Sequence, residues 1–448
     1  MFRMATARGS SGLAKAMTPF LTDLDPQAAI KGSRDPLGVQ TVWARLGRQV
    51  VGNLTTVTTS VRDFTTTILG YYFAERVANE ARSEGDLAVF LRWEQLAAYA
   101  RGEVNGDFAF RGVDRVKKNL IEGATVRLGV DSTAQILSNQ KTYGLWGLYS
   151  VASRSSGFVE GEPTRVTKLG RELIEKHYLP AFTAAGLRNA DAIVTLLAKS
   201  KTDLDINRSG RRLLEGVAKV LTPELTAYER DVYRRHLLLG GDLDKTVGGQ
   251  KILVAAMEST LGDDQWAMTP PSIRHLAKRC RTQGDVGATV ADRIEKIRTA
   301  ELLLAPASEL FGLLLASHGQ TVAEISKVAL RQWGASMPTI DVAATEALQN
   351  DLRDSSGEPE TGRRWVQLAR VMAGGDYNQA FGLLMDQNRF VMKVRGGGPW
   401  VDLDNGKLRV RFGDDNTATL SKKSELPTLW RHSYFLDSLR AMTLALKA

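Results

Sequence analysis

Residues 35–77, DPLGVQTVWARLGRQVVGNLTTVTTSVRDFTTTILGYYFAERV, combine capping residues, helical periodicity and an unusual composition over a longer run than any other part of the chain. Asp35 carries a carboxylate that can accept hydrogen bonds from the free amides of a first helical turn, and Pro36 suits the position that needs no N–H. Apolar residues such as Trp43 then recur at helical spacing. The sequence therefore predicts a helix that starts at Asp35 and ends near Gly52-Asn53.

A hydroxyl-rich run at positions 55–60 follows, and its side chains can bond nearby backbone groups, which favours a corner over a helix interior. A second helix is expected from about Ser60 to Arg82, with Gly70 at a place where another helix can approach closely. One interpretation is a packed helical hairpin. The alternative is a phosphate or partner site made by the threonine hydroxyls and three arginines, Arg45, Arg48 and Arg62.

The overall composition is that of a globular protein with a basic excess. A chain of 448 residues is long enough for two or three domains. No run approaches the roughly 18 apolar residues of a membrane span, so none is expected. The formal charge of +9 favours an acidic partner, most often nucleic acid. The single cysteine, Cys280, excludes an internal disulfide and suits a reducing cytoplasm.

A winged-helix-like hairpin is predicted near 158–166. Within residues 143–176 the pattern is a helix, a strand at Phe158–Glu160, a turn, a strand at Thr164–Val166 and a helix capped by Thr167. This order resembles the C-terminal half of winged-helix regulators, which implies that Arg154 and Arg165 face a phosphate backbone. The alternative is a hairpin that serves only to pack two helices.

The rest of the chain predicts a mainly α, multi-helix array. We expect a flexible basic N-terminus (1–30), then an N-terminal helical domain (31–178), a central helical domain (179–353) and C-terminal helices with a β-hairpin (362–448), and Asp354–Thr361 is the best candidate linker. Helices are expected in these domains over Asp86–Arg101, Asp114–Glu122, Ala190–Lys199, Arg208–Leu221, Pro223–Leu239, Val247–Leu261, Ala300–Ser317, Val322–Trp333, Thr339–Leu352, Arg363–Ala373 and Asp376–Arg395.

A basic amphipathic helix is predicted within Thr269–Ala300. Its apolar face would contain Ile273, Leu276, Ala277 and Cys280, whereas Arg274, Lys278 and Arg281 share the opposite face at helical spacing. Such a stripe is commonly a solvated surface. The alternative is contact with nucleic acid or with an acidic protein.

The C-terminal region predicts a β-hairpin near 399–412 with its turn at Asn405-Gly406, followed by a terminal helix over about Glu425–Leu446. Asp402 and Asp404 could bind Mg²⁺ beside Lys407, which would make a metal-dependent nuclease. The spacing is poor, because Asp404 falls at the turn.

Motifs for the commoner enzyme classes are missing from the sequence. It contains no G-x-x-x-x-G-K-[ST] loop, no G-x-G-x-x-G after a strand, no H-E-x-x-H pair and no G-x-S-x-G elbow. The five histidines are scattered. We therefore expect no cofactor, no metal and no catalytic residue.

Two patches carry a resemblance to a group of known proteins. The first patch is the DPLG motif with its arginine-bearing helix and a threonine run that leads into R-x-F. The second is a C-terminal PW-hairpin with a terminal pattern of Trp430, Tyr434, Phe435, Ser438 and Leu439. Together they resemble uncharacterised helical proteins encoded in bacterial anti-phage defence gene clusters. That resemblance implies a cytoplasmic subunit that works beside a nuclease, helicase or other ATPase.

The resulting hypothesis is a non-catalytic adaptor, or a subunit that senses DNA or RNA, in such a multi-protein assembly. The metal-dependent nuclease and a winged-helix transcriptional regulator remain as alternatives.

Overall fold

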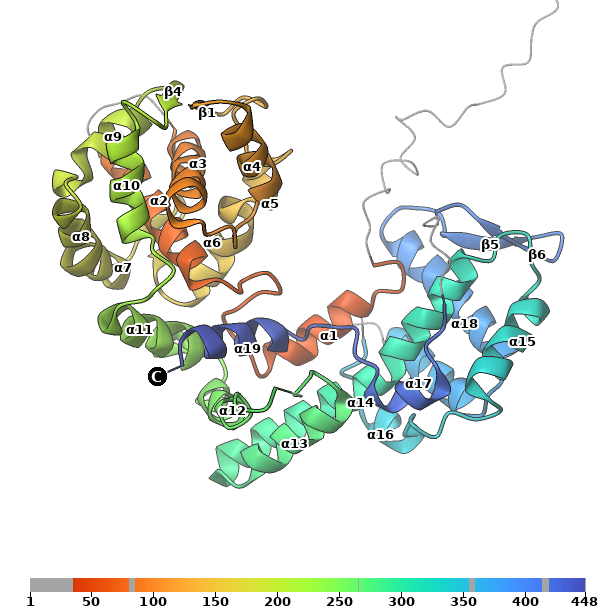
Figure 1. Cartoon of the computed structure of the whole chain (residues 1–448). Helices are drawn as coiled ribbons and strands as arrows, with labels where there is room; N and C mark the ends of the chain where they lie inside the picture. Colours follow the sequence, from red (N-terminus) through yellow and green to blue (C-terminus); the bar gives the residue numbers. More distant parts are fainter. Residues whose placement is uncertain (1–34, 80–84, 265, 354–358, 413–418, 448) are drawn as a thin grey trace, which may run out of the picture.

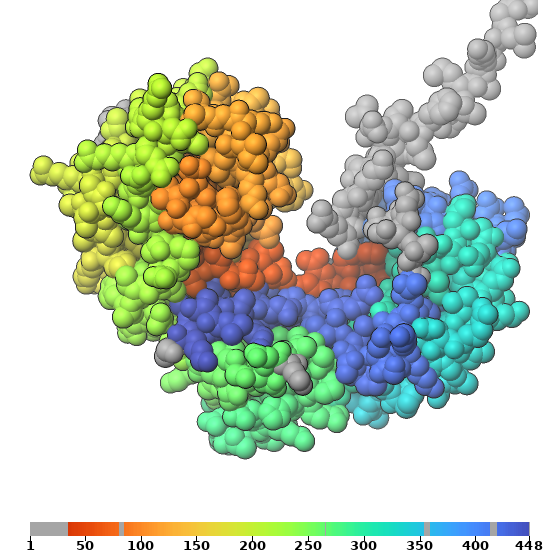
Figure 2. Space-filling view, in the orientation of Figure 1, coloured from red at the N-terminus to blue at the C-terminus, as the bar shows by residue number. Residues whose placement is uncertain are grey.

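The structure, a computed structural model, describes residues 35–79, 85–264, 266–353, 359–412 and 419–447. Two helical lobes stand on a shared helical base, and Figure 2 shows a recess between the lobes with α1 (Val39–Arg48) at its floor. The fold is mainly α with small antiparallel hairpins, as the sequence predicted. The expected N-terminal tail lies outside the described residues. No helix of the described ranges is long and apolar enough to cross a bilayer.

The N-terminal lobe is built around α2 (Val61–Asn79), which is buried on almost all sides. Gly70 admits α3 (Asp86–Asn105) so closely that a Cβ there would lie 2.6 Å from the Phe90 ring, which confirms the expected close approach. The other helices of this lobe are α4 (Val113–Glu122), α5 (Gln140–Tyr143), α6 (Leu145–Ser155), α7 (Lys168–Leu173), α8 (Leu179–Ala184), α9 (Asp191–Leu197) and α10 (Arg211–Val220), with a π-helical turn over Ile174–Tyr178 and a 3-10 turn over Arg188–Ala190.

The threonines of α2 explain how a hydroxyl-rich sequence can fill a core. The hydroxyls of Thr66 and Thr67 donate to the carbonyls of Arg62 and Asp63, one turn earlier, at 2.8 and 2.7 Å. Each hydroxyl is therefore satisfied without water. Before the helix, the Ser60 hydroxyl accepts from the Asp63 amide at 3.2 Å, in line with the predicted corner.

Two short sheets belong to the N-terminal lobe. The sheet of β1 (Thr125–Leu128) and β4 (Thr202–Asp205) joins segments that the sequence treated as loops, with Thr125 opposite Asp205. The winged-helix-like hairpin is formed by β2 (Val159–Glu160) and β3 (Arg165–Val166), and it packs on α2. The Thr167 hydroxyl caps α7 as predicted, since it accepts from the Gly170 amide at 3.2 Å.

The base contains helices from both halves of the chain. Figure 1 shows α19 and α1 above α13, and α1 packs on α14 whereas α19 packs on α12. Its helices are α1, α11 (Ala227–Tyr233) with a π-helical turn (Arg234–Leu238), α12 (Gly249–Glu258), α13 (Pro270–Arg281), the first half of α14 (Gly284–Leu315) and α19 (Leu436–Ala445), and a 3-10 turn lies at Gly241–Leu243.

The C-terminal lobe surrounds the second half of α14. Pro306 lies inside this helix, which is longer than the predicted helix over Ala300–Ser317. The lobe contains α15 (Val322–Trp333), α16 (Val342–Ala347), α17 (Pro359–Ala373), α18 (Tyr377–Val394), β5 (Val401–Asp404), β6 (Lys407–Val410) and a 3-10 helix (Lys423–Thr428). The Asn405-Gly406 turn is confirmed, with positive φ angles of 51° and 77°.

The predicted hairpin of the first two helices is wrong. Helix α1 packs on α14 in the base, whereas α2 packs on α3 and α6 inside the N-terminal lobe. The start was also placed too early: Asp35 forms a turn, its carboxylate accepting from the Gln40 amide at 3.1 Å, and the helix begins after Gly38, which has φ 74°. The hydrophobic periodicity predicted the two helices, but it could not predict which other helices they pack against.

The predicted domain boundaries also differ from the observed packing. Helices α9 and α10 lie beyond residue 178, yet they pack on α2 and α3 in one lobe. The linker expected at Asp354–Thr361 falls mostly outside the described residues, but α17 already begins at Pro359 and packs on α16.

The C-terminal segment 429–435 crosses α14 instead of forming the predicted helix over Glu425–Leu446. Glu301 of α14 is fully buried and accepts from the His432 amide at 3.1 Å, the His432 ring at 2.8 Å and the Tyr434 hydroxyl at 2.9 Å. Positive φ angles at Tyr434 and Phe435 end this crossing. Tertiary hydrogen bonds to one buried carboxylate therefore override the helical pattern of the segment.

Candidate nucleic-acid interface

Helix α13 is the basic amphipathic helix that the sequence predicted, and it contains four arginine or lysine residues and no acid. Thr269 caps it, since its hydroxyl accepts from the Ser272 amide at 3.3 Å, and Pro270 and Pro271 occupy its first turn, where no N–H is needed. The predicted apolar face is confirmed, because Ile273, Leu276, Ala277 and Cys280 are all buried. Burial raises the pKa of the Cys280 thiol to about 11, so the thiol stays neutral.

The opposite face of α13 carries cations and no acid. Arg274, Lys278, Arg279 and Arg281 are exposed, and the helix contains neither aspartate nor glutamate. Arg281 pairs with Asp292 of α14 at 2.6 Å. Within the described ranges, the side chains of Arg274, Lys278 and Arg279 have no carboxylate within ion-pair distance. Three positive charges therefore stand free along about two turns of one helix.

Each end of this cationic row borders a hollow in the surface. Lys278 and Arg279 line a cavity of about 390 Å³ whose apolar side is formed by Ile252 and Ala255 of α12. Arg274 lines a second cavity, of about 420 Å³, together with Arg298. The cations thus lie at the rims of concave surface.

The row is held on a tight helical pair. A Cβ at Gly287 of α14 would lie only 2.1 Å from the Cys280 carbonyl oxygen, so the two helices meet there in a closely packed corner. Because α13 is anchored along its whole apolar face, its cations are presented from a fixed backbone.

The two arginines predicted on α1 are engaged inside the molecule. Arg45 donates to the Arg353 carbonyl at 2.8 Å. Arg48 donates to the Leu54 carbonyl at 2.5 Å and stacks over the Phe435 ring at 3.8 Å. Desolvation lowers the pKa of Arg48. Both side chains are partly buried and join α1 to its neighbours.

Arg62 is enclosed in the N-terminal lobe, which removes it from the predicted phosphate site. Its side chain is only 5% exposed and forms an ion pair with Glu229. It also donates to the carbonyls of Thr222 at 2.5 Å and Glu224 at 2.7 Å. The guanidinium is thereby committed to holding α2 against α11, and no phosphate can reach it without unfolding that contact.

The arginines of the winged-helix-like hairpin stabilise the hairpin itself. Arg154 of α6 donates to the Thr164 hydroxyl at 2.8 Å, and Arg165 pairs with Asp86 of α3 at 2.6 Å. On the same side, Glu75 of α2 accepts from the Arg171 guanidinium at 2.7 Å. These contacts fit the alternative prediction of a packing hairpin, although Arg154 and Arg165 both keep exposed surface.

The carboxylates of the C-terminal hairpin face cations. The two oxygens of Asp402 each lie 3.3 Å from a guanidinium, one of Arg389 and one of Arg411. Asp404 lies 3.8 Å from Arg409. No group of three His, Cys, Asp or Glu side chains in the described ranges is arranged to hold a metal ion. A Mg²⁺ ion at Asp402 would have to displace both arginines.

Of the eight predicted side chains, the structure brings Arg274, Lys278 and Arg281 together on one exposed face and distributes the others among internal contacts. The sequence analysis did not select Arg279, because this residue lies outside the helical spacing of the other three. It could have been found from the absence of aspartate and glutamate along the whole helix. Searches against protein-family models, curated proteins and solved structures found no match. The interface is therefore defined by the charge and geometry of this chain alone.

Proposed function

We propose that the chain is a non-catalytic subunit that binds the phosphate backbone of DNA or RNA through α13, as an adaptor or sensor within a bacterial anti-phage defence assembly. The observation that carries the proposal is the row of Arg274, Lys278 and Arg279, free of carboxylate partners in the described ranges and set at the rims of two hollows.

Free cations on a rigid surface are the groups that phosphate oxygens attract. A protein that neutralises phosphates releases the counterions condensed on the nucleic acid, and this release favours binding at low salt. Contacts of this kind set position and orientation without reading base sequence. The interface therefore supports binding with little sequence preference.

The proposed role in a defence assembly rests on the resemblance of the DPLG and Trp430–Leu439 patches to proteins of anti-phage defence gene clusters. In the structure these patches meet: Trp43 of α1 packs edge-on against Tyr434 and Phe435, with ring centroids 6.2 and 5.4 Å apart. The arginine-bearing helix and the terminal pattern thus meet at one structural joint in the base. A nuclease, helicase or other ATPase is the kind of protein partner that the resemblance implies.

Fluorescence anisotropy tests the nucleic-acid part of the proposal. Labelled duplex and single-stranded DNA and RNA are titrated with the full chain from low to physiological salt. The combined substitution Arg274→Glu, Lys278→Glu and Arg279→Glu is expected to abolish binding at physiological salt. With milder alanine substitutions, the slope of log K against log salt on duplex DNA is expected to fall by about 0.9 for each phosphate that the protein no longer neutralises.

The matched control is the combined substitution Lys199→Glu, Lys201→Glu and Arg208→Glu. These exposed residues lie near β4 in the N-terminal lobe and give the same change in net charge. The control is expected to retain most of the affinity. An equal loss of affinity in both variants would show that the net charge of the chain, and not α13, determines binding. Absence of binding to any probe at low salt would overturn the proposal.

A further inference from the structure

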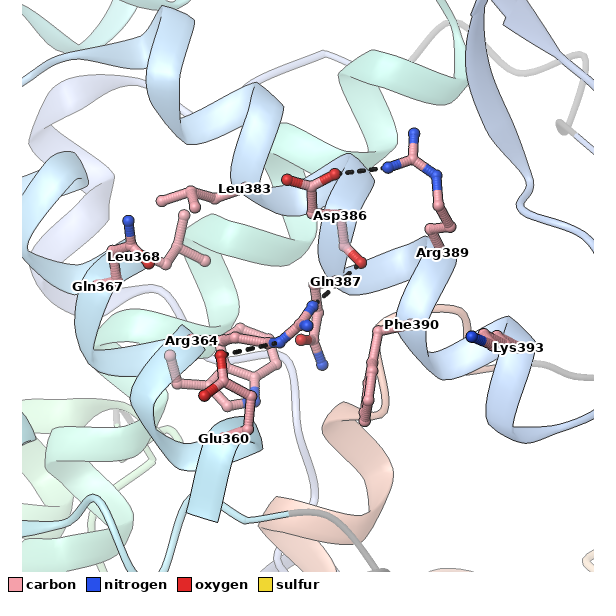
Figure 3. A pocket seen from close by; sticks show the side chains of 11 residues that line it. Glu360, Arg364, Gln367, Leu368, Leu383, Asp386, Gln387, Arg389, Phe390 and Lys393 are labelled. Atoms are coloured by element: carbon pink, nitrogen blue, oxygen red, sulfur yellow. Dashed lines mark hydrogen bonds and ion pairs between the residues drawn. The ribbon is translucent and has the colours of Figure 1, made fainter. Parts of the chain in front are cut away.

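A separate groove is lined by residues of α17 and α18. Figure 1 shows these two helices in the C-terminal lobe, away from α13. Its volume is about 500 Å³, within the range of small-molecule sites. Figure 3 shows Gln387 between Arg364 and Phe390, with Lys393 at one end. Trp365, which is 2% exposed, closes the floor.

Gln387 lines this groove and has a hydrogen-bond acceptor that no described residue uses. The residue is only 4% exposed, and its Nε2 donates to the Leu37 carbonyl at 2.9 Å. Because a carbonyl oxygen can only accept, this bond fixes the orientation of the amide. Its Oε1 accepts no hydrogen bond from any described residue. A buried acceptor without a donor is unfavourable, so a ligand that supplies an N–H would be stabilised here.

Beside this acceptor, a guanidinium covers one face of an aromatic ring. The Arg364 guanidinium stacks over the Phe390 ring, 4.5 Å from its centroid, and lies 3.8 Å from Glu360. Aromatic rings and guanidinium planes are the surfaces on which nucleobases stack. A base in the groove would thus meet Gln387 with its polar edge and the Phe390–Arg364 pair with its planar face.

The far end of the groove is positively charged. Lys393 is exposed and has no carboxylate within ion-pair distance in the described ranges, whereas Arg389 is neutralised by Asp386 at 2.6 Å and Asp402 at 3.3 Å. Gln387, Phe390 and Lys393 follow one another at intervals of three along α18, a rise of about 4.5 Å for each step. Acceptor, ring and cation therefore follow one another along the helix, from its buried side at Gln387 to its exposed side at Lys393.

We infer that this groove binds a nucleoside 5′-monophosphate unit, either free or as one nucleotide of a single strand. The base would donate an N–H to Gln387 Oε1 and stack beside Phe390, and the phosphate would lie against Lys393. The order of these three groups matches the order of base edge, ring face and phosphate in a nucleotide. This site is independent of α13, which carries the proposed backbone contact.

Isothermal titration calorimetry of the full chain with AMP, adenosine and inorganic phosphate tests the inference. AMP is expected to bind saturably, and adenosine and phosphate at least about tenfold more weakly, because each retains only part of the contacts. Phe390→Ala is expected to weaken AMP binding about tenfold or more by removing the stacking surface. Lys393→Ala is expected to weaken it several-fold and to reduce its salt dependence.

Lys327→Ala removes another exposed lysine, on α15, and is expected to leave AMP affinity within about twofold, as is the α13 triple variant. Thermal unfolding of each variant checks that it is folded. If a short single strand binds in a Phe390-dependent manner and AMP does not, the ligand is a nucleotide of a strand.

Two outcomes overturn the inference. One is binding of AMP and single strands that is unchanged by both Phe390→Ala and Lys393→Ala. The other is absence of Phe390-dependent binding of either probe, including the case in which only an acidic peptide occupies the groove. Neither outcome alters the expected behaviour of the α13 interface, so the two proposals fail separately.

Discussion

Arginines serve opposite purposes in the N-terminal lobe and on α13. In the lobe, Arg62 and Arg101 are nearly inaccessible and pair with carboxylates, Arg101 with Asp63 at 2.7 Å and Asp107 at 2.8 Å. On α13, Arg274 and Arg279 are exposed, and no carboxylate of the described ranges pairs with them. Burial and pairing, rather than residue type, decide whether a cation stabilises the fold or remains available to a partner.

The strongest test of this contrast is Arg62→Ala. Removing the guanidinium leaves Glu229, whose side chain is 2% exposed, without its main cation. Breaking a buried pair in this way costs about 3–5 kcal/mol. Urea unfolding is expected to show a loss of that size, while the matched variant Arg274→Ala changes the free energy of unfolding by less than about 0.5 kcal/mol. Similar losses in both would contradict the contrast.

A second test compares a buried acid that has a cationic partner with one that has none. Burial raises the pKa of the Glu229 carboxyl, but hydrogen bonds from His177 and Arg62 outweigh it and hold that pKa well below its ordinary value. Glu94 is buried as well. It accepts hydrogen bonds from Gln140 at 2.8 Å and the Leu145 amide at 2.7 Å, no cation among the described residues pairs with it, and burial raises its pKa to about 7.

A raised pKa makes the folded chain bind a proton that the unfolded chain has released. Stability is therefore expected to fall as pH rises from 4.5 to about 7, by about 3 kcal/mol from Glu94 alone. Glu94→Gln removes this titrating group. As the pH rises from 4.5 to about 7, the free energy of unfolding of the variant should therefore fall less than that of the native chain. Parallel pH profiles, measured by urea unfolding, would exclude the assignment.

The smallest expected effect concerns the joint between α1 and the C-terminal segment. A Cβ at Gly47 would lie 2.4 Å from the Tyr434 carbonyl oxygen, so Gly47→Ala is expected to cost about 1–3 kcal/mol and to increase amide hydrogen exchange near residue 434. In Gly382→Ala, the added methyl group in α18 meets no atom of the described residues within 4 Å. That control should be neutral or slightly stabilising, since alanine favours a helix. Equal amide hydrogen exchange near residue 434 in both variants would show that the contact between Gly47 and Tyr434 accommodates a methyl group, which would contradict the prediction.

Local signals predicted much of the secondary structure and little of its arrangement. The helix over Val322–Trp333 and the Asn405-Gly406 hairpin agree with the sequence patterns, because capping and turn chemistry act over a few residues. The pairing of β1 with β4 joins segments more than seventy residues apart, and no local pattern specifies such a partner. The terminal helix was interrupted by contacts to Glu301, which is remote in sequence.

The candidate interface was predicted in part for the same reason. The spacing of Arg274, Lys278 and Arg281 is a property of one helix, and the structure places all three on its exposed face. Whether each cation has an acidic neighbour depends on tertiary packing: Asp292 reaches Arg281, and Glu229 reaches Arg62 across 167 positions. Charge periodicity alone therefore could not separate free arginines from structural ones.

The contact between Gly47 and Tyr434 also orders events during synthesis on the ribosome. Helix α1 emerges before the other described elements, but the surface that receives Trp43 and Arg48 includes Phe435, which emerges after both lobes. Domains generally fold as their chains emerge, so the N-terminal lobe can form early while α1 waits. The base is then completed only after residue 435 has emerged, and a chain truncated before residue 430 would carry two folded lobes without a finished joint.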